Sequence, residues 1–270
     1  MHAHKTCTHA RQHPMKLINK RILIVGASSG IGRAVALLLA KRNNKLILSA
    51  RRETELRQLA RKVEACGSQA VVIAADALDA ESARQTVDKA IDACGAIDVA
   101  LLNVGDGPSF HMATVSAADI RHNMDLNYAT LVNFLTPLIA HMKQRQQGLI
   151  AHTNSLAGFL GLPMQGPYSA AKAAGRILMD TCRLELKNDN VRFVSLYPGF
   201  VATERVADDG IPAPMEISEQ QAANHMIKGM ESGRSDYLFP ASTKWLIRLA
   251  LLLPKRLTGW LLLKATPEHY

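Results

Sequence analysis

Short apolar runs alternate along the chain with longer stretches in which apolar residues recur every three to four positions. Runs of the first kind are typical of buried strands, and stretches of the second kind are typical of amphipathic helices. Strands are predicted at residues 21–25, 45–50, 70–75, 98–103, 149–155, 191–197 and 236–239. Helices are predicted between them, at residues 33–43, 53–66, 80–94, 119–147 and 218–232, with a further helix around Tyr168.

Regular alternation of strands and helices is typical of parallel βαβ units. We therefore expect an α/β fold, a doubly wound parallel sheet of about seven strands with helices on both faces. The core is expected to span residues 15–240, and residues 241–270 form a C-terminal extension. Residues 1–14 contain no apolar run, which excludes a secretory signal, and we interpret them as a disordered leader.

Composition narrows the classes of function. The net charge of +9 and the pI of about 9.5 favour an anionic partner, such as cofactor phosphates or acidic lipid. Aromatic residues make up only 5 % of the chain and do not interleave with basic runs, so we expect no nucleic-acid partner. The four cysteines lack metal-binding or redox spacing, which predicts reduced thiols, a cytoplasmic location and no metal site.

A glycine-rich segment lies between the first predicted strand and the first predicted helix. It reads Gly26-Ala-Ser-Ser-Gly30-Ile-Gly32. Backbone N–H groups and the helix dipole at such a junction bind phosphate. A flexible loop is the alternative, although loops seldom separate a buried strand from an amphipathic helix. The candidate cofactor-binding residues here are Gly26, Ser28, Ser29, Gly30, Ile31 and Gly32.

Tyr168 and Lys172 are four residues apart, so they share one face of a helix. An ammonium beside a phenol lowers the phenol pKa, which would make Tyr168 an acid and base near neutral pH. Ser155 precedes this pair across a loop rich in glycine and proline, and it would add a second hydroxyl at the same substrate oxygen. A Tyr-x-x-x-Lys pair alone is weak evidence, because a tyrosine and a lysine on one helix usually have only structural roles.

The glycine spacing taken together with Ser155, Tyr168 and Lys172 resembles the short-chain dehydrogenase/reductase family over about residues 16–240. The resemblance implies a Rossmann-type fold and an NAD(P)(H)-dependent oxidoreductase. The spacing differs from that of the family's extended branch, and the short interval from tyrosine to lysine argues against its enoyl-reductase branch.

The resemblance also assigns roles along the rest of the chain. It makes Asn127, in Asp-Leu-Asn-Tyr, a catalytic residue that holds a water joined to Lys172, although a capping or core role is the alternative. It implies that Tyr168 donates the proton, that Ser155 holds the substrate oxygen, and that Lys172 also binds the nicotinamide ribose. Further cofactor contacts are implied at Asp76, Asn103, Gly105, Pro198, Gly199, Val201 and Thr203.

The second predicted strand ends in Arg51-Arg52 and carries no acidic residue there. Enzymes that prefer NAD usually place an Asp or Glu at this point for the ribose 2′-hydroxyl. An arginine can pair with a 2′-phosphate instead, because its planar fork suits that geometry. We therefore favour NADP(H) over NAD(H), bound by Arg51 with help from Arg52 and Ser28; the alternative is that both arginines are solvated.

The C-terminal segment 244–264 reads KWLIRLALLLPKRLTGWLLLK, with five cations and no acidic residue. Charges and Pro254 leave no apolar run near about 18 residues, which excludes a simple transmembrane helix. Two short amphipathic helices are predicted. They would lie in a membrane interface with Trp245 and Trp260 as anchors, or else pack over the substrate pocket or form a dimer surface. Either arrangement indicates an apolar substrate.

The sequence therefore predicts an NADPH-dependent reductase of an apolar carbonyl compound. We expect a cytoplasmic homodimer or homotetramer, with membrane contact open, and a substrate lid at residues 204–217. One alternative is an NAD(P)-dependent alcohol dehydrogenase that works in the oxidative direction. Another is a non-catalytic NADPH-binding protein that docks on a membrane or a partner.

Overall fold

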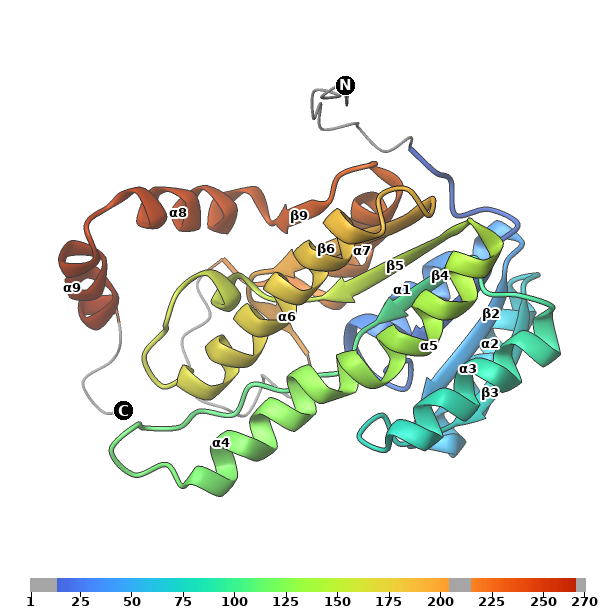
Figure 1. The fold of residues 1–270 in the computed structure, drawn as a ribbon, viewed down its shortest axis with the longest axis horizontal. Coiled ribbons are helices and arrows are strands. Elements are labelled where there is room, and N and C mark those ends of the chain that lie inside the picture. Colours follow the sequence, from blue (N-terminus) through green and yellow to red (C-terminus); the bar gives the residue numbers. More distant parts are fainter. Residues whose placement is uncertain (1–13, 204–214, 266–270) are drawn as a thin grey trace, which may run out of the picture.

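The computed structural model describes residues 14–203 and 215–265. Seven strands form one parallel sheet in the order β3-β2-β1-β4-β5-β6-β9, which confirms the predicted α/β fold (Figure 1). Their bounds are β1 Arg21–Val25, β2 Lys45–Ala50, β3 Gln69–Ala74, β4 Val99–Leu102, β5 Gly148–Thr153, β6 Val191–Pro198 and β9 Asp236–Phe239. The order changes direction at β1, which pairs with both β2 and β4. Ligands of open α/β sheets generally bind at the carboxyl ends of the strands at such a point.

Both faces of the sheet are buried, which explains the continuous apolar runs. Successive residues of β1 point to opposite faces, so Ile22 and Ile24 enter one core cluster while Leu23 and Val25 enter the other. The first cluster lies under α1 Gly30–Leu39, α2 Glu53–Ala65 and α7 Glu219–Glu231. The second lies under α3 Ala80–Cys94, α5 Thr130–Arg145 and α6 Gly166–Glu185.

The predicted helix 119–147 is divided in the structure. It consists of α4 Ala117–Met124, a π-helical turn Asp125–Ala129 and α5. Ser116 caps α4, since its hydroxyl accepts the N–H of Asp119 while the Asp119 carboxylate accepts the N–H of Ser116. The π-helical turn contains Asn127, and π-bulges of this kind occur frequently at functional sites.

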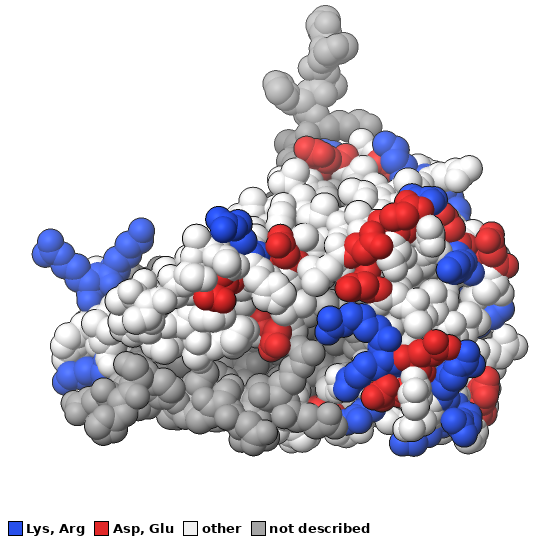
Figure 2. Space-filling view, turned by 90° about the horizontal axis from the view of Figure 1, so that it is seen from below, with Lys and Arg blue, Asp and Glu red and all other residues white. Residues whose placement is uncertain are grey.

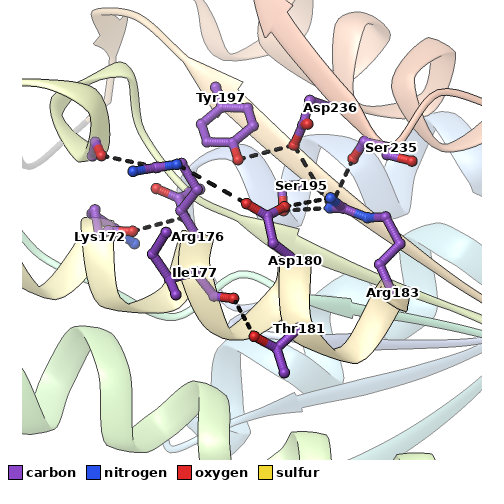
Figure 3. A network of polar contacts seen from close by, with 12 residues as sticks. Lys172, Arg176, Ile177, Asp180, Thr181, Arg183, Ser195, Tyr197, Ser235 and Asp236 are labelled. Atoms are coloured by element: carbon purple, nitrogen blue, oxygen red, sulfur yellow. Dashed lines mark hydrogen bonds and ion pairs between the residues drawn. The ribbon is translucent and has the colours of Figure 1, made fainter. Parts of the chain in front are cut away.

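A polar network fixes the C-terminal half of α6 to the sheet (Figure 3). Arg183 pairs with Asp180 on its own helix and donates hydrogen bonds to Ser195 Oγ and to the Ser235 carbonyl oxygen. Tyr197 on β6 donates to Asp236 on β9 at 3.0 Å. These contacts join α6 to β6 and β9, so the N-terminal half of the same helix projects rigidly over the carboxyl edge of the sheet.

The described part of the chain ends in α8 Ala241–Leu252 and α9 Lys255–Ala265, separated at Pro254, as predicted. Both helices lie at the end of the molecule toward which β5 and β9 point (Figure 1). A two-stranded parallel pair, β7 Val201–Ala202 and β8 Ile217–Ser218, lies between β6 and α7 in the sequence. No helix among the described residues is long and apolar enough to cross a membrane.

Most predicted bounds agree with the structure to within two residues. The first helix begins at Gly30 rather than at residue 33, because the glycine-rich turn itself enters the first helical turn. The leader at residues 1–14 falls outside the described residues apart from Pro14, as does most of the expected lid at 204–217. The division into a core and an extension stays a prediction.

Candidate active site

The glycine-rich turn after β1 is shaped by two close approaches of the backbone and by two glycines with positive φ. Gly26 has φ +83°, and a Cβ there would lie 2.6 Å from the Asn103 carbonyl oxygen. Gly30 has φ +56°, which also favours glycine. A Cβ on Gly32 would collide with the Gly26 carbonyl group, so α1 packs directly on the turn. Substitution of any of these glycines would displace the start of α1.

The N-terminus of α1 is open to a bound anion. Ser29 is the N-cap residue, yet its side chain makes no capping hydrogen bond, and the first turn contains no acidic residue. The Ser29 side chain therefore leaves the first N–H groups of α1 uncapped, and the helix dipole favours negative charge there. Ile31 lies in this first turn and is half-buried.

The two arginines after β2 take different positions. Arg52 reaches back to the glycine-rich turn, where its Nη2 atom donates a hydrogen bond to Ser28 Oγ at 3.1 Å. Arg51 is exposed at the same carboxyl end of β2. The structure thus brings Arg52 and Ser28 together. Asp76, just beyond the end of β3, is also exposed, and its Oδ1 atom accepts the N–H of Leu78 at 3.0 Å.

The turn after β4 lies beside the glycine-rich turn and close to the candidate catalytic residues. The Asn103 side-chain oxygen accepts a hydrogen bond from Thr153 Oγ1 at 2.8 Å, which joins the ends of β4 and β5. A Cβ on Gly105 would lie 2.6 Å from Asn127 Oδ1 and 2.9 Å from Lys172 Nζ. Gly105 therefore leaves the space that both side chains use.

The turn after β6 closes the same edge of the sheet. Pro198 ends β6 and is buried, and Gly199 follows it. Val201 is buried in β7, with 6 % of its surface exposed. The methyl group of Thr203 lies 3.7 Å from the position of a Cβ on Gly30, so this turn approaches the glycine-rich turn.

Asn127 is fully buried and holds the loop that follows Gly105. Its Nδ2 atom donates to the Asp106 carbonyl oxygen at 2.7 Å, and its Oδ1 atom accepts the Asp106 N–H at 3.1 Å. The same Nδ2 atom lies 3.0 Å from the Asn123 carbonyl oxygen. One side chain thus fixes the main chain of the loop 106–110 beside α6.

Ser155 and Tyr168 meet at the carboxyl edge of β5. Ser155 begins the 3-10 turn Leu156–Phe159, and its hydroxyl accepts the Ala157 N–H at 3.1 Å. The Tyr168 side chain lies beside the Ser155 hydroxyl. Burial raises the pKa of Tyr168 above its usual value of 10, although the polar contact with Ser155 acts in the opposite direction and the charge of Asp106 adds to the rise.

Lys172 lies one turn after Tyr168 and is buried, with 3 % of its surface exposed. Its Nζ atom donates to the Thr153 carbonyl oxygen at 3.1 Å and lies 5.4 Å from the centroid of the Tyr168 ring. Burial lowers the pKa of Lys172 to about 8. Contrary to our expectation, the pKa of Tyr168 is raised rather than lowered, because burial is the largest effect on it, and Lys172 Nζ is directed at the Thr153 carbonyl oxygen.

Comparison with known proteins decides the family. The sequence model described as short chain dehydrogenase matches residues 20–210. This chain belongs to the short-chain dehydrogenase/reductase family. A protein of Myxococcus xanthus named as an uncharacterized oxidoreductase is 31 % identical over 236 residues, which are 87 % of this chain and 93 % of the relative.

Solved structures share the fold. An alcohol dehydrogenase from the archaeon Thermococcus sibiricus, complexed with 5-hydroxy-NADP, has a TM-score of 0.70 and 28 % identity over 76 % of this chain and 88 % of its own. A short-chain dehydrogenase/reductase from Burkholderia phymatum, in complex with NAD, has a TM-score of 0.79 and 23 % identity over 87 % of this chain and 94 % of its own. The second likeness shows the fold alone.

The protein is thus an NAD(P)-dependent oxidoreductase of the short-chain dehydrogenase/reductase family. The site described above fits a dinucleotide. Gly26 and Gly32 let the glycine-rich turn pack closely against its neighbours, and the first turn of α1 offers N–H groups that the Ser29 side chain does not cap. Among the described residues, no group of three or more His, Cys, Asp or Glu could hold a metal ion.

Sequence reasoning missed several residues of the site. Gln165, just before α6, donates from Nε2 to the Gly107 carbonyl oxygen at 3.2 Å, and Phe110 forms a β-bridge with Gln165. A Cβ on Gly107 would lie 3.3 Å from the Tyr168 ring, so the loop 106–110 covers one side of this ring. The sequence offered one indication that Gln165 belongs to the site, which is its position three residues before Tyr168.

Proposed function

We propose that this short-chain dehydrogenase/reductase uses NADPH to reduce the carbonyl group of an apolar substrate to an alcohol. The observation that carries the proposal is the placement of the Ser155 and Tyr168 side chains beside each other, with Lys172 on the next helical turn and the glycine-rich turn nearby. Two hydroxyl groups and an amine at one edge of the sheet supply the proton and the hydrogen bonds that carbonyl reduction requires.

The bound cofactor supplies a hydride for the substrate carbon. The Tyr168 hydroxyl gives its proton to the substrate oxygen, and its raised pKa keeps that proton in place until negative charge develops there. The Ser155 hydroxyl donates a hydrogen bond to the same oxygen, an interaction that strengthens as charge develops. Lys172 binds the nicotinamide ribose and returns a proton to Tyr168. Asn127 holds the water from which that proton comes.

Two observations support NADPH as the reductant. The carboxyl end of β2 carries Arg51 and Arg52 and no acidic residue, and Arg52 already contacts Ser28 in the glycine-rich turn. A 2′-phosphate between this turn and β2 would be attracted by both guanidinium groups. The contacts of Asp76, Asn103, Gly105, Pro198, Gly199, Val201 and Thr203 with the cofactor belong to the same proposal.

An apolar substrate and a paired subunit fit the surfaces around the site. Phe110 and Met112 belong to the segment that follows the loop beside Tyr168, and Met112 is 59 % exposed. On α6, Ile177 and Leu184 are 53 % and 72 % exposed and lie two turns apart. We propose that this stripe on α6, with α5, pairs subunits into a homodimer or homotetramer of a cytoplasmic enzyme.

The decisive experiment measures NADPH consumption with 2-alkanones of increasing chain length. We expect wild-type turnover to rise with chain length, and Tyr168→Phe to lose at least about a hundredfold in kcat while it still binds NADPH. Tyr237→Phe is the matched control, because this half-buried tyrosine lies on β9 and contacts His225 instead. Equal turnover by wild type and Tyr168→Phe would overturn the mechanism.

The same assay separates the two alternatives. Turnover only with long-chain alcohols and NADP⁺ or NAD⁺ would identify a dehydrogenase that works in the oxidative direction, since the same groups serve both directions. NADPH binding without turnover of any carbonyl or alcohol would identify a non-catalytic binding protein.

A further inference from the structure

Exposed apolar side chains gather on the last two helices. Nine of the fifteen large hydrophobic residues that are exposed in the described part of the chain lie on α8 and α9 or next to them. They are Trp245, Leu246, Leu249, Leu251, Leu252, Leu257, Trp260, Leu261 and Leu263. Nine such residues within 19 positions exceed the scattered single residues that a soluble surface normally shows, so this surface is expected to have a partner.

On α8 the exposed apolar residues face away from the protein. Thr243 and Ile247 are its buried residues and attach it to the body. At about 100° per residue, Trp245, Leu249 and Leu252 lie on the opposite side of the helix, within about 60° of one another. They are 61 %, 58 % and 82 % exposed. This apolar stripe therefore does not cover the substrate site of its own subunit.

On α9 the arrangement is similar. Its buried side chain is Thr258, which donates to the Ala250 carbonyl oxygen at 3.0 Å and so ties α9 to α8. Trp260 and Leu263 lie on the far side, 52 % and 69 % exposed. The two helices together present tryptophan and leucine outward over their whole length.

The charged side chains of α8 and α9 are all positive. Lys244, Arg248, Lys255, Arg256 and Lys264 lie on these helices, and residues 241–265 contain no acidic residue. Lys244 and Arg248 each lie 5.4 Å from the Trp245 ring, and Lys264 lies 4.2 Å from the Trp260 ring. At the far left of Figure 2, the end of the molecule that carries α8 and α9, blue side chains project from a white surface.

We propose that α8 and α9 dock this enzyme on an anionic membrane surface. Tryptophan and leucine would enter the interface between headgroups and acyl chains, while the five cations bind lipid phosphates and carboxylates. A second copy of the same surface is a poorer partner, because two copies would bring ten cations together without a compensating acid in residues 241–265.

The docking helices also contact the candidate active site. Ile247 on α8 packs with Leu156 and Tyr197, and Leu156 directly follows Ser155. Thr243 Oγ1 lies 2.9 Å from the position of a Cβ on Gly199, in the turn after β6. If the substrate is apolar, which rests on the proposed function, docking would bring the site close to the lipid from which that substrate partitions.

The chain offers a direct reporter of docking. Its two tryptophans are Trp245 and Trp260, so all tryptophan fluorescence comes from this surface. We expect a blue shift when vesicles of phosphatidylcholine with phosphatidylglycerol are added, and quenching when the acyl chains carry bromine. The shift should be weak with phosphatidylcholine alone and should fall at high salt, because screening weakens the attraction between the cations and the headgroups.

Two double variants with the same change of net charge test whether vesicle binding depends on α8 and α9 or only on the total charge of the protein. Lys255→Glu with Arg256→Glu should abolish the shift and the sedimentation with anionic vesicles. Arg61→Glu with Lys62→Glu changes the net charge equally on the exposed face of α2 and should leave most of the binding. Loss of binding only in the second pair would overturn the assignment of the surface.

Three further outcomes would overturn the proposal. They are an unchanged emission with anionic vesicles, equal binding by Leu249→Ser with Leu252→Ser, and a blue shift that grows with protein concentration in the absence of vesicles. The last would identify a second copy as the partner. Tyr168→Phe should bind anionic vesicles like the wild type. The vesicle test therefore stays valid even if the catalytic proposal fails.

Discussion

The side chain of Asn127 pairs with the main chain of Asp106 at both of its polar atoms. Its amide donates to the Asp106 carbonyl oxygen at 2.7 Å and accepts the Asp106 N–H at 3.1 Å, much as a neighbouring strand would. The loop that begins here lies against the Tyr168 ring. Asn127 therefore has a structural task in addition to any role in proton transfer.

Replacement of Asn127 by alanine should release this loop. We expect kcat to fall about a hundredfold, the size of effect that a misplacement near 1 Å produces, while NADPH affinity changes little. Steady-state kinetics and a binding titration measure the two quantities. Asn224→Ala is the control, because that exposed amide donates to the Gln220 carbonyl oxygen on its own helix, α7. Wild-type turnover by Asn127→Ala would contradict the assignment.

Lys172→Met should stabilise the protein without cofactor. The folded protein holds the Lys172 pKa near 8, whereas the unfolded chain holds it near 10.5, so burial of the charge opposes folding at neutral pH. Allowing for the lost bond to Thr153, we expect roughly 2 kcal/mol of added stability at pH 7. The difference should shrink as the pH rises from 8 to 10.5.

Urea unfolding at pH 7 and pH 10 tests the prediction for Lys172. The comparison uses Lys187→Met, a substitution at an exposed lysine after α6 that should change stability at neither pH. The Lys172 variant should also lose turnover, so stability and activity move in opposite directions. A variant less stable than the wild type at pH 7 would show that the ammonium is well paired in the folded protein.

Asp98 should stabilise the fold in a pH-dependent way. Burial alone would raise its pKa, but hydrogen bonds from Arg21 and Arg145 outweigh this effect and lower the pKa to about 2. A carboxyl with a lowered pKa stabilises the folded state above its unfolded pKa of 3.8, and the effect is lost as the pH falls toward 2. Asp98→Asn should cost roughly 2 kcal/mol at pH 7, about half of that near pH 3, and little below pH 2.

Thermal unfolding of Asp98→Asn at several pH values checks this expectation. Asp88→Asn serves for comparison, because Asp88 pairs with Arg84 on the exposed face of α3 and should contribute under about 1 kcal/mol. A cost for Asp98→Asn that stays constant down to pH 3 would mean that the carboxylate charge is not what stabilises the fold.

Arg51 and Arg52 should together determine the choice of cofactor. Each substitution by alanine should weaken NADPH binding about ten- to a hundredfold, since one charge-assisted hydrogen bond to a phosphate contributes about 1.5–3 kcal/mol, and should leave NADH binding almost unchanged. Fluorescence titration with both cofactors measures the ratio. Arg61→Ala, on the exposed face of α2, is the control. A preference for NADPH that survives the double substitution would place the 2′-phosphate contact elsewhere.

The strands and the helical spacing of the candidate catalytic residues could be predicted because each rests on a local signal. A parallel sheet covered on both faces produces continuous apolar runs, and Tyr168 and Lys172 are one helical turn apart. The contacts of Asn127 and Gln165 with the loop 106–110 could not be predicted, because they bind backbone atoms far away in the sequence. The direction of Lys172 Nζ toward Thr153 likewise depends on tertiary packing.

Because of the π-helical turn Asp125–Ala129, the geometry of the site depends on the number of residues in this turn as well as on their identity. A π turn holds one residue more than the α-helical hydrogen-bond pattern accommodates. Deleting a single residue there would restore a regular helix and rotate α4 by about 100° relative to α5. Asn127 would then turn away from Asp106 even if every named residue were kept. Homologues of this enzyme should therefore tolerate substitutions in this turn more readily than a one-residue deletion.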